Sequence, residues 1–139
     1  IDERKTSILP PLNPISGKRL STSDILGISE LDCFDDFFTD LQNGCEQIGI
    51  TTQSVTSESG CGQFEVTLKH CDALTASDDA WLFKLLTKGL ARKHGIAATF
   101  MAKPYLQDAG NGMHIHFSII DRNGYNIFNN NKNEGYTTS

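Results

Sequence analysis

Two histidines and two glutamates stand where their side chains could bind a metal ion together. His114 and His116 are separated by one residue in the run GMHIHFSII, so a strand would point both imidazoles, with Ser118, to one face. Glu65 lies in the alternating run GQFEVTLK, and Glu58 precedes it by seven positions. Carboxylates and neutral imidazoles are ligands of divalent cations, and carboxylates favour Mg²⁺ or Mn²⁺. These residue types predict a divalent-metal site.

The same pattern has a plainer interpretation. Polar side chains that alternate with apolar ones are also typical of a strand with one face in water. Gly110 and Gly112 favour a binding site, because glycine lets the backbone approach a ligand closely, although a simple turn would also place them there. On either interpretation, the opposite face of the strand, with Met113, Ile115 and Phe117, is expected to be core.

The cysteines point to no chemistry of their own. No C-x-x-C spacing occurs among them, and four cysteines in a chain of this length favour reduced, half-buried thiols over a disulfide framework. Cys61 lies between two glycines, and the sequence offers no general base beside it. We therefore do not interpret Cys61 as a nucleophile.

Length and charge narrow the class of protein. A chain of 139 residues is long enough to bury a core, and its net charge of -5 argues against nucleic acid or an anionic membrane as the main partner. No apolar run approaches the ~18 residues of a membrane span, and no signal-peptide pattern is visible at the N-terminus. We expect a cytoplasmic protein without nucleic-acid or membrane partners.

Sequence periodicity predicts two helices that would hold the polar segments in place. Apolar residues recur at helical spacing from 34 to 48, and Gly49 is a typical helix stop. A longer helix is predicted over 74 to 94, with Asp72 as its N-cap and a stop at Gly95. Its buried stripe is predicted to consist of large apolar residues: Leu74, Trp81, Leu82, Leu85 and Leu90.

Strands are predicted before and after the long helix. Residues 50–55 and 62–69 precede it; residues 96–103 and 112–120 follow it, and the tight turn DRNG leads into a short strand at 126–128. This order of elements predicts an α+β fold. We expect a mostly antiparallel sheet with helices packed on one face and its other face free for chemistry.

Composition divides the chain into three regions. Residues 1–28 are rich in proline and serine and are expected to form an irregular surface segment. Residues 29–128 contain all the predicted elements, and residues 129–139 form a polar tail with nothing to bury. Because the chain begins at Ile1 rather than at methionine, we expect it to be a fragment.

Four runs of sequence resemble one enzyme family. They are ESGCGQFE from residue 58, KHCDAL from 69, RKHGIAATFMAKP from 92 and AGNGMHIHFS from 109. In order and spacing they are similar to the glutamine synthetase superfamily, which makes residues 29–128 a partial catalytic domain of that type. The wording FMAKPY and AGNGMHIH most resembles the γ-glutamylpolyamine (γ-glutamylputrescine) synthetase branch.

The resemblance implies a role for each candidate residue. Glu58 and Glu65 would bind the metal that holds the substrate γ-carboxylate, and Glu58 would also lie near the incoming amine as a catalytic residue. His114 would bind a second metal on the ATP phosphates, and the backbone of Gly110 would contact glutamate. Two further residues would lie toward the nucleotide: His116 and Ser118.

The resemblance also implies a reaction. An ATP-dependent glutamate–amine ligase would form γ-glutamyl phosphate and then glutamine or a γ-glutamylpolyamine, with ATP and Mg²⁺ or Mn²⁺ as cofactors. The substrates would be glutamate and ammonia or a polyamine such as putrescine, and the full-length protein would form a homo-oligomeric ring. The fragment alone is expected to be inactive, because other ligands of the family site are absent from it.

Two alternatives stand beside this hypothesis. A degenerate, non-catalytic homologue could serve as a binding or assembly module, but intact Glu58, Glu65 and His114 argue against it. An unrelated metal-binding sheet protein is the other, and several motifs in one register argue against that.

Overall fold

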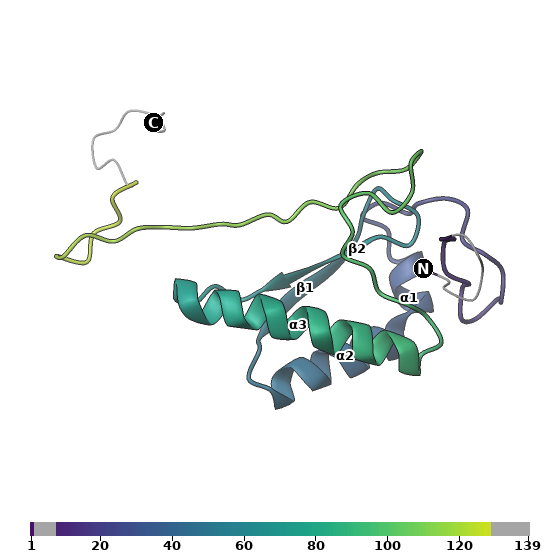
Figure 1. The fold of residues 1–139 in the computed structure, drawn as a ribbon, viewed down its shortest axis with the longest axis horizontal. Coiled ribbons are helices and arrows are strands. Elements are labelled where there is room, and N and C mark those ends of the chain that lie inside the picture. Colours follow the sequence, from purple (N-terminus) through teal and green to yellow (C-terminus); the bar gives the residue numbers. More distant parts are fainter. Residues whose placement is uncertain (2–7, 129–139) are drawn as a thin grey trace.

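A computed structural model describes residue 1 and residues 8–128, so part of the irregular N-terminal segment and the polar tail lie outside the described residues. Three helices and two strands follow one another along the chain (Figure 1): α1 (Ser29–Cys33), α2 (Asp35–Gln47), β1 (Thr52–Ser57), β2 (Phe64–Leu68) and α3 (Ala73–Lys93). The α+β class is confirmed. Within the described part of the chain, no helix is both long and apolar enough to cross a membrane.

The predicted strand pair forms an antiparallel hairpin. Val55 pairs with Val66 and Thr56 with Glu65, after an irregularity near the start of β1. Alternation along β2 places Phe64, Val66 and Leu68 on the half-buried face, whereas Glu65 and Thr67 are exposed. The hairpin therefore has one face on the core and one in water, as the sequence predicted.

Helix α2 supplies one side of the core. Phe37, Leu41 and Cys45 recur every four residues, and all three are buried. Ile50 continues this cluster after the helix ends, and Gly49 makes the turn with φ of 82°, a conformation that glycine adopts without strain. The predicted helix and its stop are both confirmed.

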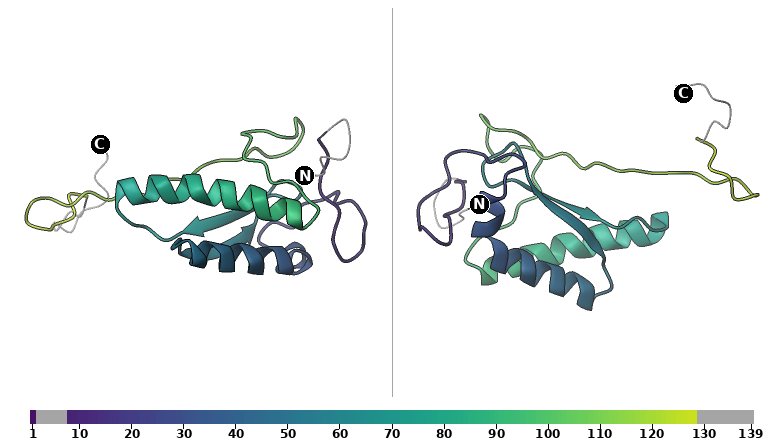
Figure 2. Two further views of the ribbon diagram at one scale, coloured as in Figure 1. Left: turned by 60° about the horizontal axis from the view of Figure 1, so that its bottom comes forward. Right: turned by 180° about the vertical axis from the view of Figure 1, so that it is seen from behind.

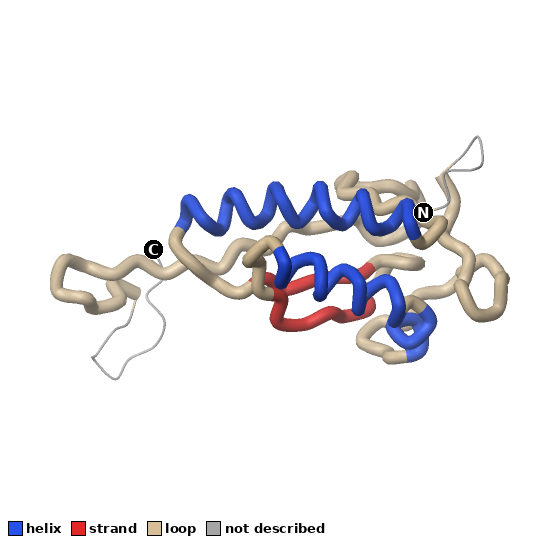
Figure 3. The backbone as a smooth tube through the Cα atoms, turned by 90° about the horizontal axis from the view of Figure 1, so that it is seen from below, coloured by secondary structure: helices blue, strands red, loops and turns tan. Residues whose placement is uncertain are grey.

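Helix α3 begins as predicted, because the Asp72 carboxylate accepts hydrogen bonds from the backbone N–H groups of Leu74 and Thr75 at 3.2 and 3.1 Å. The hydrogen bonds of this cap lower the pKa of Asp72. Figure 3 shows α3 lying side by side with α2. The cap and the packing together orient α3 against α2.

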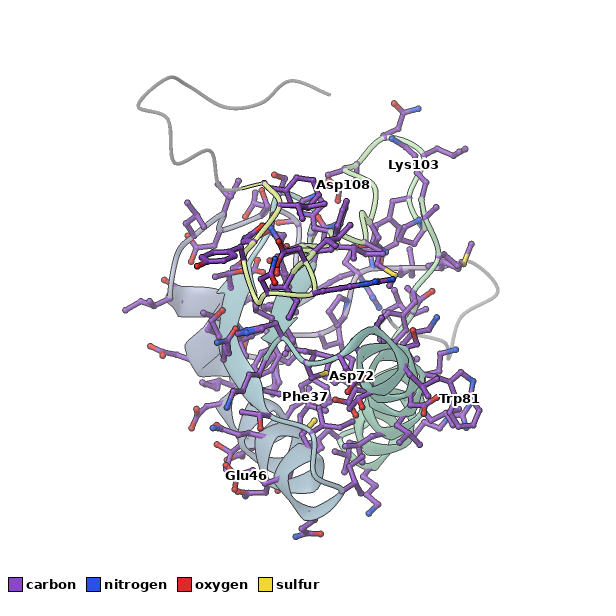
Figure 4. All side chains as sticks on the ribbon, turned by 90° about the vertical axis from the view of Figure 1, so that its left-hand side faces the viewer. Phe37, Glu46, Asp72, Trp81, Lys103 and Asp108 are labelled. Atoms are coloured by element: carbon purple, nitrogen blue, oxygen red, sulfur yellow. The ribbon has the colours of Figure 1, made fainter. Side chains whose placement is uncertain are left out.

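The buried stripe predicted for α3 was largely wrong. Its buried residues are Phe83, Thr87 and Ala91, whereas most of the predicted residues are exposed: Leu74, Trp81, Leu82 and Leu85. Figure 4 shows Trp81 on the outer side of α3, away from Phe37. Only Leu90 of the predicted stripe packs against the core.

Packing against α2 explains which face of α3 is buried. A Cβ added at Gly44 would lie 3.3 Å from Leu86 and 3.4 Å from Leu90, so glycine in α2 lets these two leucines approach closely. Helix α3 has large apolar residues on more than one side, and the spacing within α3 does not reveal which side meets a glycine of another helix.

The three strands predicted after α3 do not form within the described part of the chain. In 96–103, Ala97 exchanges hydrogen bonds with Ile1 at 2.8 and 3.0 Å, and the Ala102 carbonyl accepts from the Asn111 N–H at 2.7 Å, but these isolated bonds form no strand. The short strand at 126–128 is reduced to a single bridge between Ile120 and Asn126, although the DRNG turn closes as predicted, with the Gly124 N–H donating to the Asp121 carbonyl at 3.0 Å.

Residues 112–119 are extended but have no neighbouring strand in the described structure (Figure 2). The expectation of a buried face here was wrong, because Met113, Ile115 and Phe117 are 72%, 69% and 74% exposed. A strand is defined by a partner that satisfies its backbone N–H and C=O groups. In the described structure, residues 112–118 have no such partner, and only the Ile119 carbonyl at the end of the segment accepts from the Ile127 N–H, at 2.8 Å. The alternation of polar and apolar residues therefore predicted the extended conformation of this segment but could not identify a neighbouring strand.

Leu41→Ala and Leu85→Ala should affect the stability of this chain unequally. Leu41 is 2% exposed, so its truncation leaves a cavity and should lower the free energy of unfolding by about 2–5 kcal/mol. Leu85 is 50% exposed, so Leu85→Ala should lower the free energy of unfolding by about 0.5 kcal/mol or less. Urea denaturation of the 139-residue chain measures both values. A loss for Leu85→Ala as large as that for Leu41→Ala would contradict the exposed position of Leu85 on α3.

Candidate functional site

Two carboxylates share the exposed face of the hairpin. Glu65 pairs with Thr56, and the Glu58 N–H donates to the Gln63 carbonyl at 2.9 Å, which extends the same register past the end of β1. Glu58 therefore lies opposite Gln63, and Glu65 lies two residues beyond it on the same face. Diagonal neighbours of this kind are ~7–8 Å apart, within reach of one ligand held between two glutamates.

The turn that joins the two strands is tight. The Gln63 N–H donates to the Gly60 carbonyl at 3.0 Å, and the Gly60 N–H donates to Oε1 of Gln63 at 2.7 Å. A Cβ at Gly60 would lie 2.7 Å from that same oxygen, and Gly62 has φ of 66°. Gly62 is therefore required by the turn that carries Glu58, whereas a side chain at Gly60 would displace the end of the Gln63 side chain.

A second loop is tied to this turn through Gln63. Its Nε2 donates to the Gly110 carbonyl at 3.0 Å and to Oδ1 of Asn111 at 2.8 Å. Asn111 is held in turn, since its backbone N–H donates to the Ala102 carbonyl at 2.7 Å and its Nδ2 to the Met101 carbonyl at 2.6 Å. These bonds bring Gly110, predicted from the sequence, to the hairpin that carries the two glutamates.

Gly110 occupies a position that admits no side chain. A Cβ there would lie 2.8 Å from the backbone oxygen of Ala102, a contact that the backbone would have to move to relieve. A further bond, from the Cys61 N–H to Oδ2 of Asp108 at 2.8 Å, holds the same loop against the turn. The bonds of Asn111 to Met101 and Ala102 join the two ends of the loop from 101 to 111.

The other predicted residues are not brought to the carboxylates. His114, His116 and Ser118 are exposed on the extended segment that leaves the compact part of the chain (Figures 1 and 2). The His114 ring lies near the backbone of Gly112, where an added Cβ would be 3.4 Å from Nε2. The common face predicted for the two histidines therefore stands apart from the face that carries the glutamates.

A divalent cation fits the described residues only in part. Two carboxylates on one exposed face suit Mg²⁺ or Mn²⁺, but such ions take six or more oxygen ligands. No group of three or more histidine, cysteine, aspartate or glutamate side chains among the described residues is arranged to hold a metal ion. If a divalent cation binds here, Glu58 and Glu65 would supply only part of its coordination shell.

Buried polar groups lie beside the turn. Glu30 is 8% exposed, and burial followed by the negative charge of Asp24 raises the pKa of its carboxyl, against a bond from the Gly62 backbone that lowers it. Burial, with the charges of Cys61 and Asp108, raises the pKa of Tyr105 to about 12. Both groups are therefore held in their neutral forms more strongly than in water.

Cys61 belongs to the same buried group. Burial first, and then the negative charges of Glu30 and Asp108, raise the pKa of its thiol. Because the thiolate is the nucleophilic form, this environment is the opposite of that of a reactive cysteine. The prediction that Cys61 is not a nucleophile agrees with its surroundings.

Two other polar residues have structural or surface positions. Nε2 of His94, which follows α3, lies 2.8 Å from Oδ2 of Asp40 on α2 and joins the two helices. Lys103 is exposed, and Figure 4 shows it pointing away from the rest of the molecule. Neither residue faces the carboxylate pair.

Sequence reasoning missed the residues that assemble this region: Gln63, Asp108 and Asn111. Alternation in the run GQFEVTLK predicts no more for Gln63 than an outward polar side chain. The residue type was itself a signal, because the carboxamide of glutamine both donates and accepts hydrogen bonds. It can therefore join two backbone segments. Nothing in the spacing, however, indicated which loop it would meet.

A family model described as "Glutamine synthetase, catalytic domain" matches residues 1–139. The chain therefore belongs to the glutamine synthetase catalytic-domain family, which confirms the resemblance carried by its motifs.

Particular relatives include enzymes that join glutamate to amines. Gamma-glutamylputrescine synthetase PuuA of Escherichia coli (strain K12) is 39% identical over 119 residues, covering 85% of this chain and 25% of that protein. Glutamate–isopropylamine ligase of a Pseudomonas species is 38% identical over 115 residues, covering 83% and 22%. Glutamine synthetase of Rhizobium meliloti (strain 1021) is 34% identical over 139 residues, covering 94% and 32%.

Solved structures give the same relationship. Apo GmaS without ligand has a TM-score of 0.80 and 27% identity, covering 99% of this chain and 31% of that one. A GmaS/ADP complex has the same TM-score and identity. This chain spans roughly a quarter to a third of the length of these relatives.

Cys61 should react with iodoacetamide at least about tenfold more slowly than Cys71, since a buried, protonated thiol is a poor nucleophile. Cys61 is 8% exposed, whereas Cys71 is exposed. Mass spectrometry of the chain at successive times, at pH 8, gives the two rates. Faster labelling of Cys61 than of Cys71 would contradict the burial of the Cys61 side chain within the turn.

Proposed function

We propose that this chain is a segment of the catalytic domain of an ATP-dependent glutamate–amine ligase, with residues 29–128 as the part that contributes to the site. One observation carries the proposal beyond family membership. The two glutamates predicted as metal ligands share an exposed hairpin face, and Gln63 ties that hairpin to Gly110, the residue predicted to contact glutamate. This connection between residues far apart in the sequence supports the proposal.

The reaction explains why such residues are needed. A carboxylate does not condense with an amine, because oxide is a very poor leaving group. ATP is expected to convert the γ-carboxylate of glutamate into γ-glutamyl phosphate, and the amine then displaces phosphate. Bound Mg²⁺ or Mn²⁺ would neutralise the oxygens that gather charge during phosphoryl transfer.

Each residue of the chain has a distinct part in this proposal. Glu58 and Glu65 would hold the cation beside the substrate γ-carboxylate, and Glu58, at the turn, would also face the incoming amine. The Gly110 backbone, which has no side chain in the way, would contact glutamate. On the extended segment, His114 would bind the cation at the ATP phosphates, with two residues toward the nucleotide: His116 and Ser118.

The amine substrate is proposed to be an alkylamine such as putrescine. Two of the relatives are named for putrescine and isopropylamine, and the motif wording of residues 100–116 supports the same branch. A homo-oligomeric ring and a cytoplasmic location complete the proposal for the whole protein. The family resemblance supports the ring, and cysteines expected to be reduced support the location.

The complete protein that contains this chain should release ADP only when ATP, glutamate, an amine and Mg²⁺ are all present. The kcat/KM for putrescine should exceed that for ammonia, and EDTA should abolish turnover until Mg²⁺ is restored. The isolated 139-residue chain should release no ADP, because its carboxylates form only part of a metal site. A coupled ADP assay with both amines measures this.

A higher kcat/KM for ammonia than for any amine would contradict the proposed substrate. Absence of glutamate-dependent ADP release from the complete protein would instead favour a non-catalytic homologue.

His114→Ala and His116→Ala should have different kinetic effects in the complete protein. Loss of a metal ligand should lower kcat by several orders of magnitude, whereas loss of a supporting residue should mainly raise KM for ATP, by ~10- to 100-fold. Steady-state kinetics with varied ATP, and Mn²⁺ titration followed by electron paramagnetic resonance, separate the two. Unchanged Mn²⁺ binding in His114→Ala would reverse the assignment.

A further inference from the structure

The Gln63 side chain joins two segments that are more than 40 residues apart in the sequence. Its Oε1 accepts from the Gly60 N–H at 2.7 Å, while its Nε2 donates to the Gly110 carbonyl at 3.0 Å and to Oδ1 of Asn111 at 2.8 Å. One carboxamide thus uses its acceptor on the turn and its donors on the loop. The side chain acts on both segments at once.

Each end of this connection is itself fixed. On the turn, the Gln63 N–H donates to the Gly60 carbonyl at 3.0 Å, and the Cys61 N–H donates to Oδ2 of Asp108 at 2.8 Å. On the loop, Nδ2 and the backbone N–H of Asn111 donate to Met101 and Ala102, which leaves Oδ1 facing Gln63. A rigid connection between two fixed segments sets the distance between them.

We propose that Gln63 is a positioning residue for glutamate: it sets the separation between the Glu58–Glu65 pair and the Gly110 backbone. This inference rests on the proposed function. In the hairpin register Gln63 lies opposite Glu58 and two residues before Glu65, so a shift at Gln63 moves both carboxylates relative to the loop. A glutamate substrate that contacts both the carboxylate pair and the Gly110 backbone must match that separation.

The same geometry predicts which substrate is affected. The bonds of Gln63 end at Asn111, whereas the proposed nucleotide residues, His116 and Ser118, lie beyond it on the extended segment. A change at Gln63 should therefore raise KM for glutamate and leave KM for ATP nearly unchanged. A role in stability alone would instead lower the amount of folded enzyme and alter neither KM.

Gln63→Glu is the sharpest test in the complete protein. A carboxylate keeps the acceptor for Gly60 but has no donor, and it faces two acceptor oxygens, those of Gly110 and Asn111. The kcat/KM for glutamate should fall about 10²-fold, mainly through KM, as expected for a misplaced substrate. Gln53→Glu, at an exposed position on the same hairpin, adds the same charge and should change neither constant.

Two neighbouring variants complete the kinetic test. Gln63→Met, similar in size and uncharged, removes all three bonds and should show the same selective rise in KM for glutamate. The double variant Gln63→Met/Asn111→Ala should lose little more than the larger single loss, because both substitutions break one connection. Equal rises in KM for both substrates, or an unchanged KM for glutamate, would overturn the proposal.

Hydrogen exchange tests the connection without any assay of activity. In the complete protein, Gln63→Met, which removes all three bonds, should speed exchange at the N–H groups of Gly60 and Asn111, while exchange in α3 stays unchanged. Unchanged exchange at both N–H groups would overturn the positioning role. If the wild-type protein shows no glutamate-dependent ADP release, the proposed function fails, and the exchange result still decides whether Gln63 holds the two segments together.

Discussion

The antiparallel register of β1 and β2 is the constraint on which the candidate site depends. A slip by one residue would turn Glu65 toward the core and move Phe64, Val66 and Leu68 into water, so burial of these three side chains specifies the pairing. The tight turn then extends that register to Glu58. The position of the carboxylate pair is therefore a consequence of core packing on the opposite face of the same two strands.

Helices α2 and α3 stabilise that register from the core side. Phe37, Leu41 and Cys45 of α2 pack with Phe83 and Ala91 of α3, and Val66 and Leu68 of the hairpin rest on this cluster. The opposite face of the hairpin, with Glu65 and Thr67, is exposed. Apolar residues thus lie on one side of the two strands and the candidate carboxylates on the other.

The segment that carries His114 and His116 depends on different interactions. Its backbone is extended, its apolar side chains are exposed, and no described strand lies beside it. An unpaired strand of this kind gains order only when a neighbour satisfies its backbone groups. Under the proposal that the chain is part of a larger catalytic domain, such a neighbour would also decide how far the histidines stand from Glu58 and Glu65.

The sequence by itself determined the local elements as far as α3, and the family. Alternation in GQFEVTLK, the Asp72 cap and the Gly49 stop each act within a few residues, so their outcomes could be predicted. Several motifs in one register were enough to identify the family. Tertiary structure alone decided which face of α3 is buried, because that choice depends on Gly44 of another helix. It also decided that Gln63 meets Gly110 and Asn111, since a carboxamide can bond any backbone and only the fold brings that loop within 3.0 Å.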